Sequence, residues 1–321
     1  MSTALHPFKS VTYRGTAPGP RLLVTAVVHG NEVCGRVALL RLMDELDRGE
    51  RVLRRGQLTL VPVTNALAFQ QGTRNGHRNL NRAFGPAAVA REFEDHVANW
   101  LAPVMADHEV LLDLHSFNAQ GQPFALLGPR NNRGEVEPFS RAAEEEALVR
   151  VLGVDRVVDG WLDTYVRGVA RRRAEAGPEA GRFDLNPNYG VGTTEYMRSR
   201  GGCAVTLECG QHADPQGPLV GHRAVVQAMA HLGLTDDPSP RLQRPAEALT
   251  LKEVVDKAHA DDRFAREWKS FDRVAAGELI GRRADGVEVR AERDGIIMFP
   301  NTAAQAHQEW FYWAEASDRF A

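Results

Sequence analysis

Three polar side chains suited to metal binding and proton transfer follow directly after strongly apolar runs of the chain: His29, His115 and Glu208. Such runs are typical of buried strands, and the ligand sites of open α/β sheets lie outside the carboxyl edge of the strands. We therefore expect the fold to bring these three residues to one edge of one sheet.

The segment His29-Gly-Asn-Glu32 places an imidazole and a carboxylate three residues apart, where a strand is expected to turn into a helix. Alone, a His-x-x-Glu pair is a weak signal. His115 strengthens it, because two histidines and one glutamate leave the fourth position of a tetrahedral zinc ion open to water, as in catalytic sites. The sequence thus predicts one Zn²⁺ per chain, held by His29, Glu32 and His115.

Asp113 lies two residues before His115, so both side chains point to the same face of the expected strand. From there the carboxylate can accept a hydrogen bond from the imidazole and orient it toward the metal. The alternative is a buried carboxylate that caps a turn.

The segment from Arg74 to Arg82 is too polar for a core element and lies soon after an apolar run, so we expect it to line the cleft. One arginine there could bind a substrate carboxylate through two parallel hydrogen bonds. A second could polarise a carbonyl on which negative charge develops. A solvated arginine loop is the alternative.

Apolar runs and helical patterns alternate along the first two thirds of the chain. Strands are expected at 22–28, 58–63, 110–114 and 203–207. Apolar residues at helical spacing predict helices around 39–46, 93–101 and 225–232, with Gly49 placed to end the first. This alternation predicts an α/β fold with a mostly parallel or mixed sheet flanked by helices.

A proline-rich stretch at 235–245 suggests a domain boundary. We predict a catalytic α/β domain at 1–236, a linker at 237–248 and a small all-β domain at 249–321, where glycine-spaced strand-like runs favour hairpins. Between 167 and 192 the pattern dissolves into turn-forming residues, and a loop over the site is expected.

The composition is that of a globular protein: of 321 residues, 43% are hydrophobic and 25% charged, and the formal net charge is -3. No basic face favours nucleic acid, and Arg171, Arg172 and Arg173 are interpreted as a solvated turn. We expect neither a secretory signal nor a membrane span. Three cysteines favour a reducing compartment, so a cytoplasmic protein is predicted. The oligomeric state is left open, a homo-oligomer included.

Four motifs, in matching order, make the chain resemble the succinylglutamate desuccinylase and aspartoacylase family, within the zinc carboxypeptidase superfamily. They are His29-Gly-Asn-Glu32, Asn79-Leu-Asn81-Arg82 with Arg74 eight residues before Arg82, Asp113-Leu-His115-Ser, and Thr206-Leu-Glu208-Cys-Gly210. The segments 294–301 and 309–312 are similar to the family's C-terminal β domain. The fold implied is a zinc-carboxypeptidase-like mixed sheet with a small C-terminal all-β domain packed near the active-site cleft.

The resemblance also implies roles for the side chains. His29, Glu32 and His115 would bind zinc. Arg74 would polarise the scissile carbonyl, Asn81 and Arg82 would hold the substrate carboxylate, and Glu208 would be the general base.

Arg198 stands ten residues before Glu208, where aspartoacylases carry an arginine that grips the acidic side chain of the substrate. The alternative is an ordinary helix with a solvent-facing arginine. Tyr189 and Tyr312 are both candidates for a family tyrosine near the site. Five other histidines are interpreted as surface or structural residues: His77, His96, His108, His212 and His231.

Together these features predict a zinc-dependent hydrolase that acts on carbon-nitrogen bonds. It would be a deacylase that cleaves the amide bond of an N-acyl amino acid, or of a similar small carboxylate substrate, by metal-activated water; esters are a further substrate class. A zinc carboxypeptidase is an alternative with the same constellation. A metal-dependent binding module without catalysis is an alternative of another class, against which the pair Arg74 and Glu208 argues, because a binder has no use for a general base.

Overall fold

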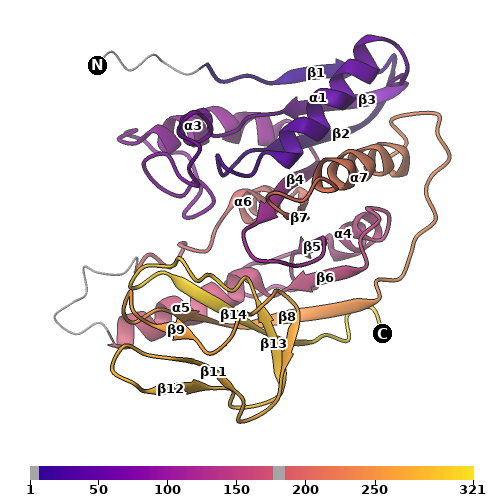
Figure 1. Ribbon diagram of the computed structural model, residues 1–321. Coiled ribbons are helices and arrows are strands. Elements are labelled where there is room, and N and C mark those ends of the chain that lie inside the picture. The colour runs from indigo at the N-terminus through magenta and orange to yellow at the C-terminus, as the bar shows by residue number, and fades with distance from the viewer. Residues whose placement is uncertain (1–6, 176–184) are drawn as a thin grey trace.

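The computed structural model describes residues 7–175 and 185–321. They form an α/β architecture in which an eleven-stranded mixed sheet is flanked by helices and a second, three-stranded antiparallel sheet lies near the C-terminal end (Figure 1). The predicted fold class is confirmed.

The elements follow one another in the expected alternation through the first two thirds of the chain. The helices are α1 (Cys34–Asp47), α2 (Ala66–Gln71), α3 (Phe93–Ala106), α4 (Ala142–Val149), α5 (Trp161–Glu175), α6 (Thr193–Ser199) and α7 (Gly217–His231). The strands of the large sheet are β1 (Val11–Arg14), β2 (Ala17–Ala26), β3 (Arg55–Val61), β4 (Val110–Phe117), β5 (Phe124–Leu127), β6 (Arg156–Asp159), β7 (Cys203–Gln211), β8 (Glu247–Asp256), β10 (Asp272–Val274), β13 (Gly295–Met298) and β14 (Glu309–Ala316). The small sheet contains β9 (Arg263–Phe264), β11 (Leu279–Arg282) and β12 (Glu288–Arg290).

The middle of the large sheet is parallel and buried on both faces. Its spatial order is β1-β3-β2-β4-β7-β5-β6-β8-β14-β13-β10, and β3, β2, β4 and β7 run parallel to one another. Leu22 and Val24 pack into a core shared with α1 and α7, whereas Leu23 packs into a second core shared with α3. A strand that is covered on both sides needs apolar residues at every position, which explains the continuous apolar runs of the sequence.

The four predicted strands and three predicted helices are all present, with ends that shift by up to eight residues, as at the start of α7. The expected loop at 167–192 is partly wrong, because α5 continues as a helix to Glu175. Residues 176–184 of that range lie outside the described residues. The solvated turn expected at Arg171 to Arg173 is also wrong: these residues belong to α5, and buried Arg172 pairs with Asp256 of β8 at 2.7 Å.

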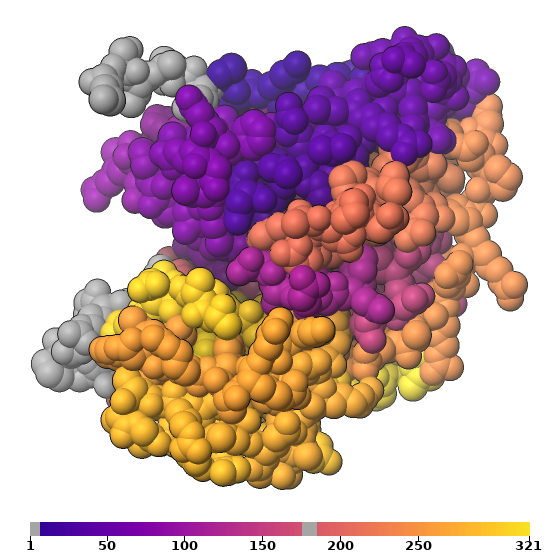
Figure 2. Space-filling model, in the orientation of Figure 1, coloured from indigo at the N-terminus to yellow at the C-terminus, as the bar shows by residue number. Residues whose placement is uncertain are grey.

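The C-terminal strands continue the large sheet. β8 pairs in parallel with β6 and antiparallel with β14, and β13 and β10 follow at the edge. Figure 2 shows these C-terminal residues as a block against the rest of the molecule. The predicted division into two domains, with a linker at 237–248, stays a prediction. Backbone hydrogen bonds between β6 and β8 join the two parts of the chain in one sheet.

No helix within the described ranges has the length and apolar character needed to cross a membrane.

Truncation after Pro245 tests that division. The shortened chain leaves β6 without its partner β8 and removes β14, which covers Phe124 and Tyr165 in a shared core. We expect it to be insoluble or to lack a cooperative thermal transition, because an apolar core and a sheet edge are exposed together. Far-UV circular dichroism with thermal unfolding measures this. A soluble truncated protein that unfolds cooperatively would instead establish 1–236 as an independent domain.

Candidate active site

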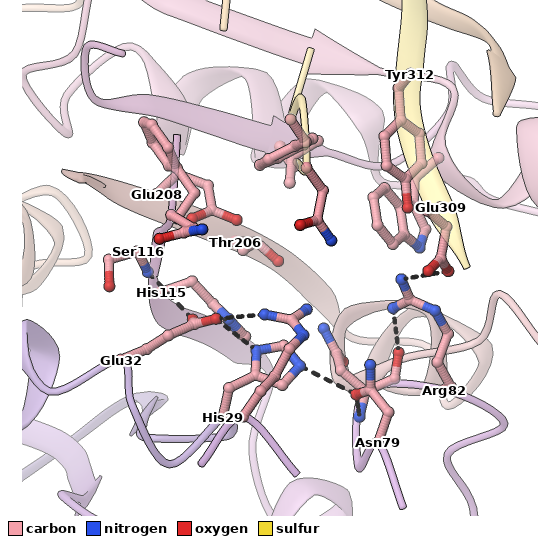
Figure 3. A pocket seen from close by; sticks show the side chains of 18 of the residues that line it. His29, Glu32, Asn79, Arg82, His115, Ser116, Thr206, Glu208, Glu309 and Tyr312 are labelled. Atoms are coloured by element: carbon pink, nitrogen blue, oxygen red, sulfur yellow. Dashed lines mark hydrogen bonds and ion pairs between the residues drawn. The ribbon is translucent and has the colours of Figure 1, made fainter. Parts of the chain in front are cut away.

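The carboxyl ends of β2 and β4 bring His29, Glu32 and His115 together. His29 Nδ1 lies 2.8 Å from Glu32 Oε1, and His115 Nδ1 lies 2.8 Å from Glu32 Oε2. The ligand atoms of the three buried side chains all lie within 4.8 Å of one another. Both imidazoles thus turn the same ring nitrogen toward one carboxylate (Figure 3), as a single shared cation requires.

The other nitrogen of each ring has a fixed partner. His29 Nε2 lies 3.0 Å from Asn79 Oδ1, and His115 Nε2 lies 3.0 Å from Asp113 Oδ2. When each Nε2 donates its hydrogen to these oxygens, each Nδ1 keeps a lone pair for a metal. The predicted contact of Asp113 with His115 is present. The contact of Asn79 was not predicted, although Asn79 belongs to the motif that contains Asn81 and Arg82.

Asp113 is fully buried and accepts three hydrogen bonds. Besides His115, the hydroxyl of Thr25 donates to it at 2.7 Å and that of Thr193 at 2.5 Å. Burial alone would raise the pKa of Asp113, but His115 and these hydroxyls outweigh it and lower the pKa. The carboxylate therefore stays ionised and holds the imidazole in place. Thr193, on α6, carries no signal in the sequence that would have identified it.

The donor set fits a divalent cation. Burial, with Arg74 nearby, lowers the pKa of His29 to about 4, so this ring is neutral. His29 Nδ1 is buried and, among the described residues, makes no hydrogen bond, although Glu32 Oε1 lies beside it. For His115, burial is outweighed by Asp113 and Glu32, which raise its pKa well above the ordinary value. His115 therefore holds a proton in the absence of a metal, at the point where the ligand atoms converge. A metal ion that binds there displaces this proton.

The backbone before the first ligands is constrained. Val27, a β-branched residue, has φ of 55°, in the left-handed region, where strain often marks functional sites. A Cβ added at Gly30 would lie 2.0 Å from the carbonyl carbon of Ala68 in α2. Only glycine therefore fits at position 30 of the His29-Gly-Asn-Glu32 motif.

Glu208 reaches the same site from β7, where it is paired in register with His115 of β4. It is buried, and its Oε2 finds no hydrogen-bond partner within the described residues. Burial, together with the charge of Glu32, raises the pKa of Glu208 to about 8 against the attraction of His115. A buried carboxylate that binds protons this readily is suited to proton transfer.

Arg82 lies across the pocket from Glu208, in a cluster that includes the last long strand (Figure 3). It donates to the hydroxyl of Tyr165 at 2.6 Å and pairs with Glu309 of β14 at 3.3 Å. Burial would raise the pKa of Glu309, but Arg82 outweighs it and lowers the pKa to about 2. Tyr312, also on β14, contacts the hydroxyl of Tyr165. Of the two candidate tyrosines, Tyr189 and Tyr312, it is Tyr312 that lines the pocket. Tyr165, which contacts both Arg82 and Tyr312, was not identified from the sequence.

Arg74 and Asn81 also line the pocket. Arg74 donates to Glu32 Oε1 at 2.7 Å, and its side chain is 47% exposed, so much of its guanidinium faces solvent. Asn81 Oδ1 accepts the backbone N–H of Thr193 at 2.9 Å, which leaves its amide nitrogen as the group that can donate to a ligand. The roles assigned to both residues stay predictions.

Arg198 is buried on α6, so the solvent-facing alternative is wrong. Its Nε donates to Glu137 at 2.6 Å, and its Nη2 donates to Glu195 at 2.6 Å. Its Nη1 lies 3.5 Å from Glu145 and donates to the carbonyl of Ala204 at 3.0 Å. Its role in binding substrate stays a prediction, but three carboxylates already surround it.

These side chains surround a cavity of about 360 Å³. That volume is at the small end of ligand sites. Its apolar wall comes from Phe117, Trp161 and Phe299. His212, interpreted from the sequence as a surface or structural residue, also lines it and shares a 2.8 Å hydrogen bond with Ser116 Oγ.

Comparison with known proteins agrees with the fold and the motifs. Residues 18–160 match the family model described as the succinylglutamate desuccinylase/aspartoacylase catalytic domain. The predicted resemblance to this family is thereby confirmed. No curated protein matches the chain.

Solved structures of similar fold cover almost the whole chain. A succinylglutamate desuccinylase/aspartoacylase from Rhodobacter sphaeroides has a TM-score of 0.70 at 18% identity, with 97% of this chain and 89% of that chain covered. The product-bound ectoine utilization protein EutE (DoeB) from Ruegeria pomeroyi has a TM-score of 0.70 at 19% identity, covering 96% and 88%. A succinylglutamate desuccinylase from Vibrio parahaemolyticus has a TM-score of 0.68 at 15% identity, covering 98% and 93%. At these identities the likeness shows the fold.

Gly30→Ala tests the close approach of the metal-binding loop to α2. The added methyl must push the loop or the helix aside, so we expect a loss of about 1–3 kcal/mol in unfolding free energy and weaker zinc binding. Chemical denaturation and competition with a chromophoric chelator measure the two effects. Gly85→Ala is the matched control, since nothing lies within 4 Å of a Cβ at Gly85. If both variants had the same unfolding free energy and the same zinc affinity, the close approach of Gly30 to α2 would not constrain the site.

Asp113→Asn tests the orientation of His115. The amide nitrogen of the asparagine would face at least one of the three groups that now donate a hydrogen bond to the carboxylate. His115 would then be held less firmly, so we expect zinc affinity to fall about 10- to 100-fold. The same chelator competition measures it. Asp163→Asn, an exposed change on α5, serves as the control. Unaltered affinity in Asp113→Asn would show that this carboxylate does not position the ligand.

Proposed function

We propose that this protein is a zinc-dependent hydrolase that cleaves the amide bond of an N-acyl amino acid or a similar small carboxylate substrate. One observation carries the proposal: the buried group His29, Glu32 and His115 stands beside Glu208, a buried carboxylate with an unpartnered oxygen, in one cavity. The match of residues 18–160 to a deacylase family supports the same reaction class.

His29, Glu32 and His115 would hold the metal, two through Nδ1 and one through its carboxylate. When bound, zinc acts as a Lewis acid and lowers the pKa of water toward neutrality. Asn79 and Asp113 fix the two rings, so the ligand atoms need not search for their orientation when an ion arrives.

Glu208 is the residue to which we assign proton transfer. Its side chain accepts a proton from the attacking water and passes it to the nitrogen of the departing amine, which would otherwise leave as an unstable anion. The high proton affinity that burial gives this carboxylate suits both steps.

Arg74 and Arg82 are assigned to the negative charges of the substrate. Arg74 is half exposed in the pocket, where its guanidinium can donate to the oxygen of the scissile carbonyl as charge develops there. Arg82, with the amide of Asn81, is placed to bind a carboxylate. Its Nε is buried and, in the described part of the chain, has no hydrogen-bond partner, so it has a donor to offer.

The size of the site favours a small acylated substrate over a peptide. The cavity of about 360 Å³ is closed on one side by Glu309 and Tyr312 of β14. A zinc carboxypeptidase would need room for the chain that precedes the cleaved bond. Glu208 argues against a binding module. Its buried Oε2 has no hydrogen-bond partner among the described residues, which weakens the fold and is explained by catalysis.

Glu208→Gln separates catalysis from metal binding. The amide keeps the shape of the side chain but cannot accept a proton, so we expect kcat/KM on a panel of N-acyl amino acids to fall about 10²- to 10⁴-fold while zinc content stays at one per chain. Metal analysis and amine release measure the two quantities. Glu50→Gln, at an exposed surface, is the control. Undiminished turnover would refute the assigned role, and cleavage confined to peptides would refute the deacylase.

A further inference from the structure

One wall of the cavity carries a buried arginine whose charge is already balanced. We name this wall the α6 subsite. It consists of Leu126, Leu127, Thr194, Glu195, Arg198 and Thr206. Arg198 is its cation, and a substrate carboxylate would be expected to bind there if the guanidinium were free.

The surroundings of Arg198 exclude that. Glu137, Glu145 and Glu195 approach the guanidinium from three sides, and with the carbonyl of Ala204 they engage four of its five N–H groups. Glu145 is fixed from behind by the backbone N–H groups of Gly128 and Ala204, at 2.8 and 2.7 Å. Glu195 is likewise held by the backbone N–H of Gly192 at 2.9 Å and the hydroxyl of Thr194 at 3.0 Å. Glu145 and Glu195 therefore cannot easily swing away to make room for an incoming anion.

Carboxylates outnumber cations in this cluster. With all three carboxylates ionised, the cluster has an excess of two negative charges over the single guanidinium. Burial raises the pKa of Glu137 to about 7 and also raises that of Glu145. Protonation of both would still leave Arg198 paired with Glu195, a neutral pair. A second substrate carboxylate here would be a buried anion without a counterion, which is strongly unfavourable.

The surroundings of Arg82, which lines the same cavity, differ. Arg82 faces one carboxylate, Glu309, and keeps a buried Nε that has no hydrogen-bond partner among the described residues. Arg74 is half exposed. The cavity thus has donors for one carboxylate around Arg82 and Arg74. At the α6 subsite, leucines and threonines lie beside an arginine whose charge the surrounding carboxylates already neutralise or exceed.

We propose that the α6 subsite selects for an uncharged group, so that the preferred substrates carry one carboxylate and the substrates with a second, acidic group are rejected. The proposal rests on the proposed function and names its substrate class. Arg198 here is a positioning residue that fixes Glu195 and the wall, and selection against acids arises from the carboxylates around it.

Ligands that differ only in charge test the proposal. Binding to the full-length, zinc-loaded Glu208→Gln protein is measured by calorimetry for N-acetyl-L-asparagine against N-acetyl-L-aspartate, and for N-succinyl-L-alanine against its terminal amide. In at least one of these pairs we expect the ligand with the neutral amide to bind at least tenfold more tightly than the corresponding acid. In neither pair do we expect the acid to bind more tightly. Preference for the acid in either pair, or no binding by any of the four ligands, overturns the inference.

Neutralising the surrounding carboxylates tests the cause. In Glu137→Gln/Glu195→Gln, both amides can still accept from Arg198, and Glu145 remains as its counterion. The excess negative charge of the ionised cluster is removed, so we expect the preference for the neutral ligand to shrink at least fivefold. Glu137→Gln alone should shrink it less, and it provides the test if the double variant fails to fold. Glu144→Gln, an exposed carboxylate on α4 outside the cluster, should leave the preference unchanged. An unchanged preference in every cluster variant refutes the proposal.

Failure of the proposed function gives a different result. If the wild-type protein hydrolyses no N-acyl amino acid while the binding preference for amides persists, the reaction is wrongly assigned and the subsite stands. If hydrolysis occurs and N-acetyl-L-aspartate is the better substrate, the reaction stands and the subsite assignment is refuted.

Discussion

The site depends on one buried carboxylate that faces two imidazoles. Glu32 lies 2.8 Å from a ring nitrogen of His29 and of His115, although no hydrogen bond links it to His29. A buried ionised carboxylate beside a neutral imidazole lone pair is unfavourable, so this arrangement persists only where the surrounding structure enforces it. The parallel strands β2 and β4 do so, since they deliver both histidines to the same sheet edge.

The surrounding residues constrain the same point from several directions. Asn79 and Asp113 fix the rings, the backbone of Ala68 in α2 leaves no room for a side chain at Gly30, and Glu208 enters from the next strand, β7. These contacts come from segments far apart in the sequence. A site held in this way is rigid before any ligand arrives, which is the property that gives electrostatic catalysis its strength.

Local patterns in the sequence were enough to predict the parallel strands, the main helices and the convergence of His29, Glu32 and His115. A run such as 22–28 is apolar at every position because both of its faces are covered, and that signal is strong. Short elements such as β5, β6 and α4 have too few residues for a period to show. The environment of Arg198 could not be predicted either, because Glu137 and Glu145 reach it from distant segments and an isolated glutamate carries no mark of its partner.

The position of β14 in the chain affects how the protein is made. The three residues that could hold a metal ion, His29, Glu32 and His115, are all synthesised within the first 115 positions. Glu309 and Tyr312, which line the pocket from β14, come near the end of the sequence. A nascent chain on the ribosome therefore carries all three proposed metal ligands before the cavity has a complete wall. A metal ion bound early could organise the edge of the sheet during translation, while selective recognition of a substrate has to wait for the last strand to be released and to pair.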